Sequence, residues 1–283
     1  MNHDHHPTTA GDTATGGRPG LGASLRAAGR PLLVPYVTGG VTAGWTDYLL
    51  AYQEAGADAI EVGLPFSDPM LDGATIQQAS DTALARGATM DLILDDLRDT
   101  PLRVPVVVMT YANLVLRDGI ARLAAAGVSG LIVPDLPLEE SGPLEAAAAA
   151  AGIDLVLLAA PATPDDRLRE ICARSRGFVY AISVMDTTGE RGTLAGTATA
   201  LAARVKAVTD LPVLVGFGIS TPAQAAEAGR AGDGAVVASA LMRRVLDGAT
   251  PADLGRAVAA LRAALDLGVS PGTPHAEVSG HRG

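Results

Sequence analysis

The chain has 283 residues, a length that fits one large domain or two small ones. Hydrophobic residues make up 48% of it but aromatic residues only 3%, so the core must be aliphatic, which suits a parallel sheet covered on both faces. The formal net charge of −10 argues against nucleic acid and anionic membranes as partners, because both bind basic surfaces.

Three further features narrow the class of protein. The single cysteine, Cys172, excludes an internal disulfide and a cysteine-rich zinc site, and we expect it to be a buried apolar residue. No apolar run reaches the roughly 18 to 20 residues that cross a bilayer, and the N-terminus lacks the basic and apolar regions of a signal peptide. We therefore expect a cytoplasmic protein.

Both ends of the chain are expected to be loose tails. Residues 1–22 contain many His, Gly, Thr and Asp residues and almost no large apolar side chains, so burial cannot offset the entropy lost on ordering. Their histidines, His3, His5 and His6, are expected to be solvated rather than to hold a metal ion. Residues 270–283 have a similar character, which leaves 23–269 as one catalytic domain.

Within this domain, short aliphatic runs alternate with Ala-rich segments that have helical spacing. The runs predict strands at 32–37, 59–62, 106–109, 130–133, 155–158, 178–182, 213–215 and 235–237. Helices are predicted at 46–55, 75–85, 90–98, 117–126, 139–150, 164–174, 196–208, 221–230 and 253–265, with a short helical run that ends at 246. Eight strands that alternate with helices favour an α/β fold, a closed (β/α)8 TIM barrel, over an open doubly wound sheet.

Glycines support this repeating pattern. Gly56, Gly127 and Gly232 follow predicted helices, and each is expected to end its helix with a positive φ. The phrase Gly216-Phe217-Gly218-Ile219-Ser220 lies late in the chain and lacks the third glycine of a dinucleotide-binding fingerprint. A dinucleotide site on an open sheet is therefore not expected.

Glu61 is the first candidate for chemistry. It lies in the second predicted strand between Ile60 and Val62, so its side chain points to the opposite face from those two residues. A carboxylate in the dry helical layer would cost several kcal/mol without a partner, whereas at the barrel mouth it can have a raised pKa and transfer protons. The alternative is a structural glutamate that pairs with a basic residue.

Asp72 is the second candidate, in the loop that follows this strand. Two prolines and a glycine allow the loop to fold back over the end of the strand and bring a second carboxylate to the same pocket. Asp72 can equally be a turn or helix-capping residue near Thr75, and Asp68 in its Ser-Asp-Pro turn has the same alternative.

Two further loops are expected at the same mouth. Barrels often bind phosphate through the loops after strands 7 and 8 and a short helix, so Gly216–Ser220 and Ser239 are candidates; glycines needed only for tight turns are the alternative. The polar loop 183–192 is long and contains glycines, which is typical of a lid. Tyr180 in the preceding strand either contributes its hydroxyl to the mouth or is a core aromatic.

At these motifs the sequence resembles the tryptophan synthase α subunits. The phrase Glu61-Val-Gly-Leu-Pro-Phe-Ser-Asp-Pro, which continues to Asp72-Gly-Ala-Thr-Ile-Gln77, is highly specific. The supporting phrases begin at Val34, Met109, Pro134, Thr188 and Gly216, occur in order and extend the resemblance over residues 30 to 265.

The resemblance implies retro-aldol cleavage of indole-3-glycerol phosphate to indole and glyceraldehyde 3-phosphate. It gives Glu61 the acid–base steps, lets Asp72 accept from the indole N–H and places Tyr180 near the reacting bond. It also implies roles in binding the ring, in orienting Asp72 and in holding the phosphate. These fall to Tyr36, Ile76, Tyr111 and Phe217 for the ring, to Thr188 for Asp72, and to Gly189, Gly218 and Ser239 for the phosphate.

The resemblance further implies an α2β2 heterotetramer with a separate β subunit that carries pyridoxal phosphate, and no metal or organic cofactor in this chain. The loops 65–69 and 187–191 would form the docking surface. Ala238 and Asp186 stand where the family commonly has glycine, and the lid after Gly189 is shorter. These departures motivate one alternative, a stand-alone lyase that releases free indole.

Two other functions fit the sequence less well. A sugar-phosphate isomerase barrel is expected to have an aspartate at the ends of strands 1 and 5, and none is found near Val37 or Leu158. A non-catalytic regulator of a β subunit would not need Glu61 and Asp72.

Overall fold

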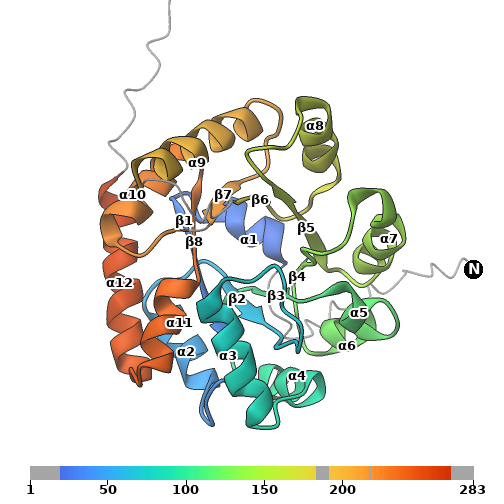
Figure 1. The fold of residues 1–283 in the computed structure, drawn as a ribbon, viewed down its shortest axis with the longest axis vertical. Coiled ribbons are helices and arrows are strands. Elements are labelled where there is room, and N and C mark those ends of the chain that lie inside the picture. Colours follow the sequence, from blue (N-terminus) through green and yellow to red (C-terminus); the bar gives the residue numbers. More distant parts are fainter. Residues whose placement is uncertain (1–19, 183–190, 217, 269–283) are drawn as a thin grey trace, which may run out of the picture.

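The computed structural model describes residues 20–182, 191–216 and 218–268, with the backbone alone for 191–195. Its strands close into a parallel barrel in the order β1 to β8, and helices surround them (Figure 1). The expected (β/α)8 barrel is therefore confirmed. The strands are β1 Leu32–Thr38, β2 Ile60–Gly63, β3 Val106–Met109, β4 Gly130–Ile132, β5 Asp154–Ala159, β6 Val179–Ile182, β7 Val213–Gly216 and β8 Gly234–Val237.

The helices follow the strands and begin at recognisable signals. α10 and α12 each start at a threonine whose side chain and N3 residue form a capping box, followed by a proline. The helices are α1 Leu21–Ala27, α2 Thr46–Glu54, α3 Ala74–Ala85, α4 Met90–Asp99, α5 Ala112–Val115, α6 Gly119–Ala125, the 3-10 helix η1 Leu138–Glu140, α7 Gly142–Ala150, α8 Asp165–Arg174, α9 Arg191–Lys206, α10 Pro222–Ala231, α11 Ser239–Leu246 and α12 Pro251–Leu267.

Side chains of the strands alternate between two apolar layers. Residues that point outward, such as Ile60 and Val62, belong to the large layer beneath the helices. Residues that point inward, such as Val34 and Val107, fill the barrel together with Leu21 and Leu25 of α1. This alternation decides which polar side chains of the strands face the barrel interior.

α1 begins at Leu21, two residues before the boundary expected for the N-terminal tail. Leu21 is fully buried, and a Cβ added at Gly130, the first residue of β4, would lie 2.6 Å from its Cδ2. The helix therefore closes the end of the barrel where the strands begin.

One expectation about glycines is wrong. Gly56 and Gly127 have φ values of 91° and 72°, as a C-cap requires, but Gly232 has a φ of −115°. A Cβ at Gly232 would lie 2.5 Å from the carbonyl oxygen of Val213. This glycine is needed for the close approach to β7 rather than for a left-handed backbone.

A buried ion-pair network fixes the last helix to the barrel. Arg262 of α12, only 6% exposed, donates to Asp58 at 3.0 Å and to Asp266 at 2.6 Å. The Asp58 oxygen that accepts from Arg262 also accepts from the backbone N–H of Leu33 at 2.8 Å. α12 and β1 are therefore held by the same carboxylate.

None of the helices in the described part of the chain combines the length and apolar character that crossing a membrane requires.

Candidate active site

Glu61 lies on β2 and points into the barrel. Its neighbours Ile60 and Val62 belong to the outer layer, and its backbone pairs with Tyr36 of β1 and Val107 of β3. The side chain is 1% exposed, and its Oε2 atom has no hydrogen-bond partner among the described residues. Burial, and secondarily the charge of Asp72, raise the pKa of Glu61 to about 8.

Asp72 lies in the loop between β2 and α3, which folds back over the strand. The backbone N–H of Asp72 donates to the Pro69 carbonyl at 3.0 Å. From α3, Gln77 Nε2 donates to the Asp72 carbonyl at 2.8 Å and to that of Pro69 at 3.3 Å. The N-cap of α3 is Gly73, with no side-chain cap bond, so the capping alternative for Asp72 is not observed.

The surroundings of Asp72 also favour its neutral form, though less strongly. Burial raises its pKa to about 6, while a hydrogen bond from the Tyr111 hydroxyl opposes that rise. Since the charge of Asp72 contributes to the raised pKa of Glu61, the two carboxyl groups are electrostatically coupled within one site. The loop after β2 thus brings Asp72 near enough to Glu61 for its charge to raise the pKa of that glutamate.

Two inward tyrosines share the barrel interior with Glu61, and each lies over a glycine of the next strand. A Cβ added at Gly63 would lie 1.9 Å from the Tyr36 hydroxyl, and one at Gly216 would lie 2.2 Å from Cε2 of Tyr180. The Tyr36 hydroxyl shares a hydrogen bond of 3.1 Å with Thr38. Burial raises the pKa of both tyrosines, with a further contribution from Glu61, so both hydroxyls stay protonated.

Tyr111 connects this group to the loop after β2. Its ring stacks on Phe66 with centroids 4.9 Å apart, and its hydroxyl donates to Asp72 Oδ2 at 3.3 Å and accepts from the Leu71 N–H at 3.1 Å. Ile76, in the first turn of α3, is 8% exposed and packs in the outer apolar layer. The sequence predicted only an apolar role for Tyr111. Its hydrogen bond to Asp72, and the two hydrogen bonds from Gln77 to the carbonyl groups of Pro69 and Asp72, were not predicted.

Three of the predicted residues, Thr188, Gly189 and Phe217, lie outside the described residues. Of the other phosphate-binding candidates, Gly218 has a φ of 74° and open space where a Cβ would be. Ser239 is the first residue of α11 and is separated from β8 by Ala238 alone. Both follow the carboxyl ends of neighbouring strands, as expected for a phosphate site in a barrel.

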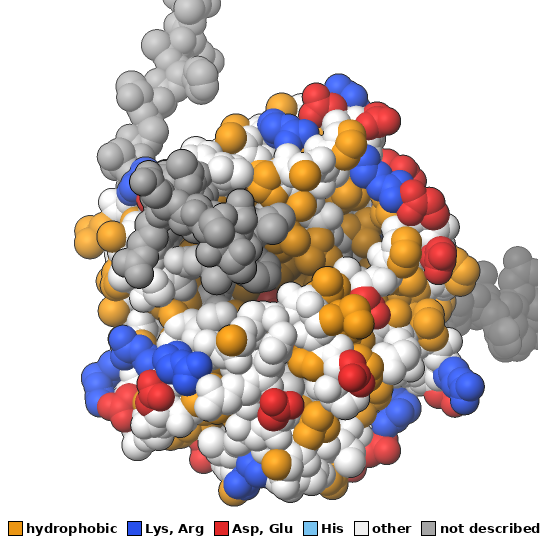
Figure 2. All heavy atoms as spheres, in the orientation of Figure 1, with side chains coloured by type: hydrophobic (Ala, Val, Ile, Leu, Met, Phe, Trp, Pro, Cys, Tyr) orange, Lys and Arg blue, Asp and Glu red, His pale blue; other side chains and the backbone are white. Residues whose placement is uncertain are grey.

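The middle of the molecule is hollowed in the space-filling view, and the wall of the hollow is largely hydrophobic (Figure 2). Among the described residues, no group of three or more His, Cys, Asp or Glu side chains is placed to hold a metal ion.

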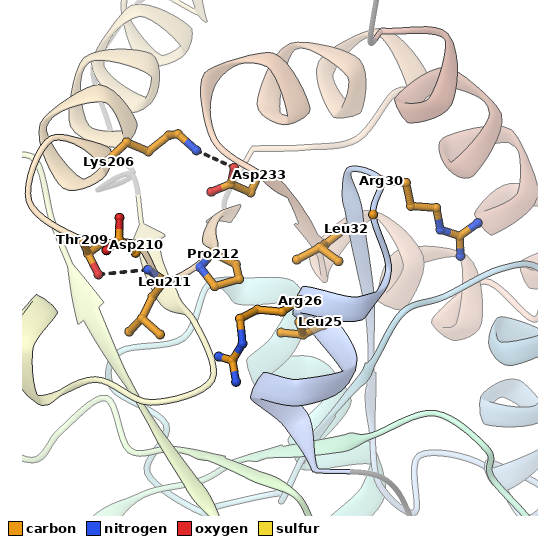
Figure 3. Close-up of a pocket in the computed structure, with 11 residues that line it drawn as sticks. Leu25, Arg26, Arg30, Leu32, Lys206, Thr209, Asp210, Leu211, Pro212 and Asp233 are labelled. Atoms are coloured by element: carbon orange, nitrogen blue, oxygen red, sulfur yellow. Dashed lines mark hydrogen bonds and ion pairs between the residues drawn. The ribbon is translucent and has the colours of Figure 1, made fainter. Parts of the chain in front are cut away.

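A separate cleft with a volume of about 450 Å³ lies at the opposite end of the barrel, where the strands begin (Figure 3). Its basic side chains include Lys206, which pairs with Asp233, and Arg30, which pairs with Asp58 at 2.9 Å. Since barrel enzymes place their chemistry at the carboxyl ends of the strands, this cleft is not the candidate active site.

The likeness to known proteins covers the whole barrel. Residues 23–264 match the family model described as tryptophan synthase alpha chain. The chain is 47% identical to the tryptophan synthase alpha chain of Chloroflexus aurantiacus over 79% of its own length and 87% of that relative. The chain belongs to this family. It is also 45% identical to the alpha chain of Gloeobacter violaceus, over 83% of this chain and 88% of that one.

Solved structures support the same conclusion. A ligand-free tryptophan synthase from M. tuberculosis is 37% identical, with a TM-score of 0.78 over 87% of this chain and 98% of that one. A mutant alpha subunit from Pyrococcus furiosus is 34% identical, with a TM-score of 0.74 over 83% and 98%. The expected function, cleavage of indole-3-glycerol phosphate by a carbon–carbon lyase of L-tryptophan biosynthesis, is confirmed by this membership.

Proposed function

We propose that Glu61 and Asp72 are the acid–base pair that cleaves indole-3-glycerol phosphate to indole and glyceraldehyde 3-phosphate. The observation that carries this proposal is the contrast between their environments: Glu61 is 1% exposed and its Oε2 atom has no partner among the described residues, whereas Asp72 is half-buried and accepts from the Tyr111 hydroxyl. Burial accordingly raises the pKa of Glu61 to about 8 and that of Asp72 only to about 6. At neutral pH the first is therefore mainly protonated and the second mainly ionised. Two carboxyl groups with separated pKa values suit an acid and a charge-stabilising base.

The chemistry requires a proton at indole C3 and the loss of one from the glycerol hydroxyl. Glu61 donates the first proton, which places positive charge on the ring, and Asp72 accepts from the ring N–H and stabilises that charge. The carbon–carbon bond then breaks, its electrons return to the ring, and the hydroxyl becomes the aldehyde. The Glu61 carboxylate takes the hydroxyl proton and is restored for the next turnover.

The apolar slot for the ring is proposed to be formed by Tyr36, Tyr111, Ile76 and Phe217. Tyr36 and Tyr111 support this proposal, because the charge of Asp72 contributes to the raised pKa of both hydroxyls and Asp72 must therefore lie near them. Tyr180 would line the slot near the reacting bond, because the charge of Glu61 contributes to the raised pKa of its hydroxyl.

The phosphate is proposed to bind at the far side of the mouth. Gly218 and Ser239 follow neighbouring strands and would donate through backbone and hydroxyl groups, together with Gly189. Thr188 would orient Asp72 when the loop closes.

We further propose that a β subunit takes up the indole in an α2β2 assembly. Two large apolar side chains stand exposed in the loop that carries Asp72: Met70 is 80% exposed and Leu71 51%. The backbone N–H of Leu71 donates to the Tyr111 hydroxyl, so this loop lies at the barrel mouth. Such side chains are typical of an interaction surface.

The decisive assay for catalysis compares two variants that each replace one carboxyl group with an amide. Glu61→Gln should lower turnover by orders of magnitude, while Glu140→Gln, on the exposed helix η1, should keep the parent rate. Parent activity in Glu61→Gln would overturn the proposal.

The assay repeated with and without a β subunit tests the assembly. A rate that rises on mixing, and rises less for Met70→Asp, supports docking at this surface. A high rate alone that does not change on mixing would favour a stand-alone lyase.

A further inference from the structure

Asp135 is a carboxylate at the barrel mouth to which the reaction described above gives no role. It follows β4 in a turn between Pro134 and Pro137, closed by a hydrogen bond of 3.4 Å from Leu136 N to the Val133 carbonyl. Two prolines restrict the backbone of this turn.

The segment after the turn is held from α8. Arg174 Nη2 donates to the Leu138 carbonyl at 2.8 Å and to the Ser141 hydroxyl at 2.6 Å. The turn that carries Asp135 is therefore fixed on both sides.

The Asp135 carboxylate reaches across to the segment after β3. Its Oδ1 atom accepts from the backbone N–H of Ala112 at 2.9 Å. Ala112 is the first residue of α5, where that N–H has no partner within the helix, and the N-cap residue Tyr111 forms no side-chain cap bond. Asp135 thus supplies from another loop the cap that α5 lacks.

This contact fixes the backbone on one side of Tyr111, and the β-ladder fixes the other. Thr110 N donates to the Ile132 carbonyl of β4 at 3.0 Å, so Tyr111 lies between two contacts to the same neighbouring segment. Its ring and hydroxyl then reach Phe66, Leu71 and Asp72.

We propose that Asp135 is a positioning residue for the cleavage reaction: its bond to Ala112 N places Tyr111 so that the Tyr111 hydroxyl holds the Asp72 carboxylate. This inference rests on the proposed function of Asp72. The groups that act electrostatically around Asp72 are Glu61 on β2, Tyr36 on β1 and Tyr111 before α5, and Asp135 acts on Tyr111.

The consequence is a defined change in ionisation. The hydrogen bond from Tyr111 lowers the pKa of Asp72 against the effect of burial. When Asp135 is lost and Tyr111 moves, Asp72 becomes harder to ionise, so more of it is protonated at neutral pH.

The kinetic test compares Asp135→Ala, Asp135→Asn and Asp118→Ala. Asp118 is the matched control, because it is an exposed aspartate at the N-cap of α6 and makes no side-chain cap bond. Asp135→Ala should lower kcat about 10-fold, since small misplacements of reacting groups cost this much or more. The acidic limb of the kcat/KM profile should move up by about one pH unit, the effect of one lost hydrogen bond to a charged group.

Asp135→Asn keeps an oxygen that can accept from Ala112 N, so it should restore both the rate and the pH profile, and Asp118→Ala should change neither. A profile that does not move in Asp135→Ala would overturn the proposal. So would a loss that Asp135→Asn does not rescue, because a charge rather than a cap would then be needed.

A spectroscopic readout separates this proposal from the catalytic one. The chain has only five tyrosines, so 19F NMR of protein labelled with 3-fluorotyrosine can resolve Tyr111, assigned by its loss in Tyr111→Phe. The signal should move in Asp135→Ala and return in Asp135→Asn, whether or not the protein cleaves substrate. An unmoved signal would refute the positioning role even if Glu61 and Asp72 are the catalytic pair.

Discussion

The burial of Glu61 predicts a pH-dependent cost to stability that a single substitution removes. In the unfolded chain a glutamate titrates near its usual pKa of 4.5, and burial raises the pKa of Glu61 to about 8 in the folded protein. The folded state therefore holds a proton that the unfolded state releases, so stability falls as pH rises from 4.5 to 8 and then levels off. At about 1.4 kcal/mol per pH unit, the whole cost is about 5 kcal/mol.

Glu61→Gln has no such titration, because its side chain stays neutral at every pH. The Glu61 Oε2 atom is buried and has no partner among the described residues, and the amide of the variant is expected to lack one too. The free-energy cost of this missing hydrogen bond does not depend on pH. The difference in unfolding free energy between variant and parent should therefore grow by about 4 kcal/mol between pH 5 and pH 9.

Urea unfolding at pH 5, 7 and 9 measures this difference. Glu140→Gln, which also removes one carboxylate but from an exposed position, should track the parent at all three values. A difference between Glu61→Gln and the parent that stays constant across this range would mean that Glu61 ionises without penalty and is not a proton donor at neutral pH.

Three other substitutions probe the structure around the site. Arg262→Ala should lower the unfolding free energy by about 1.5 to 3 kcal/mol, measured by urea, because it removes the buried arginine from Asp58 and leaves only the more exposed Arg30 beside that carboxylate. Gly63→Ala should reduce kcat/KM by about 10-fold or more in the cleavage assay, because the new methyl group must displace the Tyr36 hydroxyl. Ser239→Ala should raise KM and weaken the binding of inorganic phosphate, seen by calorimetry, with a smaller effect on kcat.

Each of these has a control or an outcome that contradicts it. Arg256→Ala, on the exposed side of the same helix at 72% exposure, should change stability by no more than about 1 kcal/mol. Gly142→Ala, where nothing lies within 4 Å of the added Cβ, should leave catalysis unchanged. Phosphate binding that is unaffected in Ser239→Ala would remove this residue from the phosphate site.

The order and type of the barrel elements could be predicted because each repeats a local signal. Every predicted strand is observed within two residues of its bounds, because a short aliphatic run between two Ala-rich helical segments is typical of a buried strand. α1 was missed because only Leu21 and Leu25 mark it, and their importance comes from filling the end of the barrel. Gly232 was misjudged because its need for glycine arises from the Val213 carbonyl, which is distant in sequence.

The site was predictable where it depends on alternation along a strand. Glu61 points inward because Ile60 and Val62 point outward, which the sequence already indicates. The contacts of Tyr111 and Asp135 join loops that follow different strands, and no local pattern reports such a pairing. Both residues lie within phrases that carry the family resemblance, which was the available signal.

The most direct test is a crystal structure of the Glu61→Gln variant with indole-3-glycerol phosphate bound. We expect the indole N–H within hydrogen-bond distance of Asp72, C3 of the ring next to position 61, and the phosphate beside Gly218 and Ser239. A ligand that binds with its ring away from position 61, or with Asp72 out of reach of the ring nitrogen, would show that Glu61 and Asp72 are not the acid–base pair.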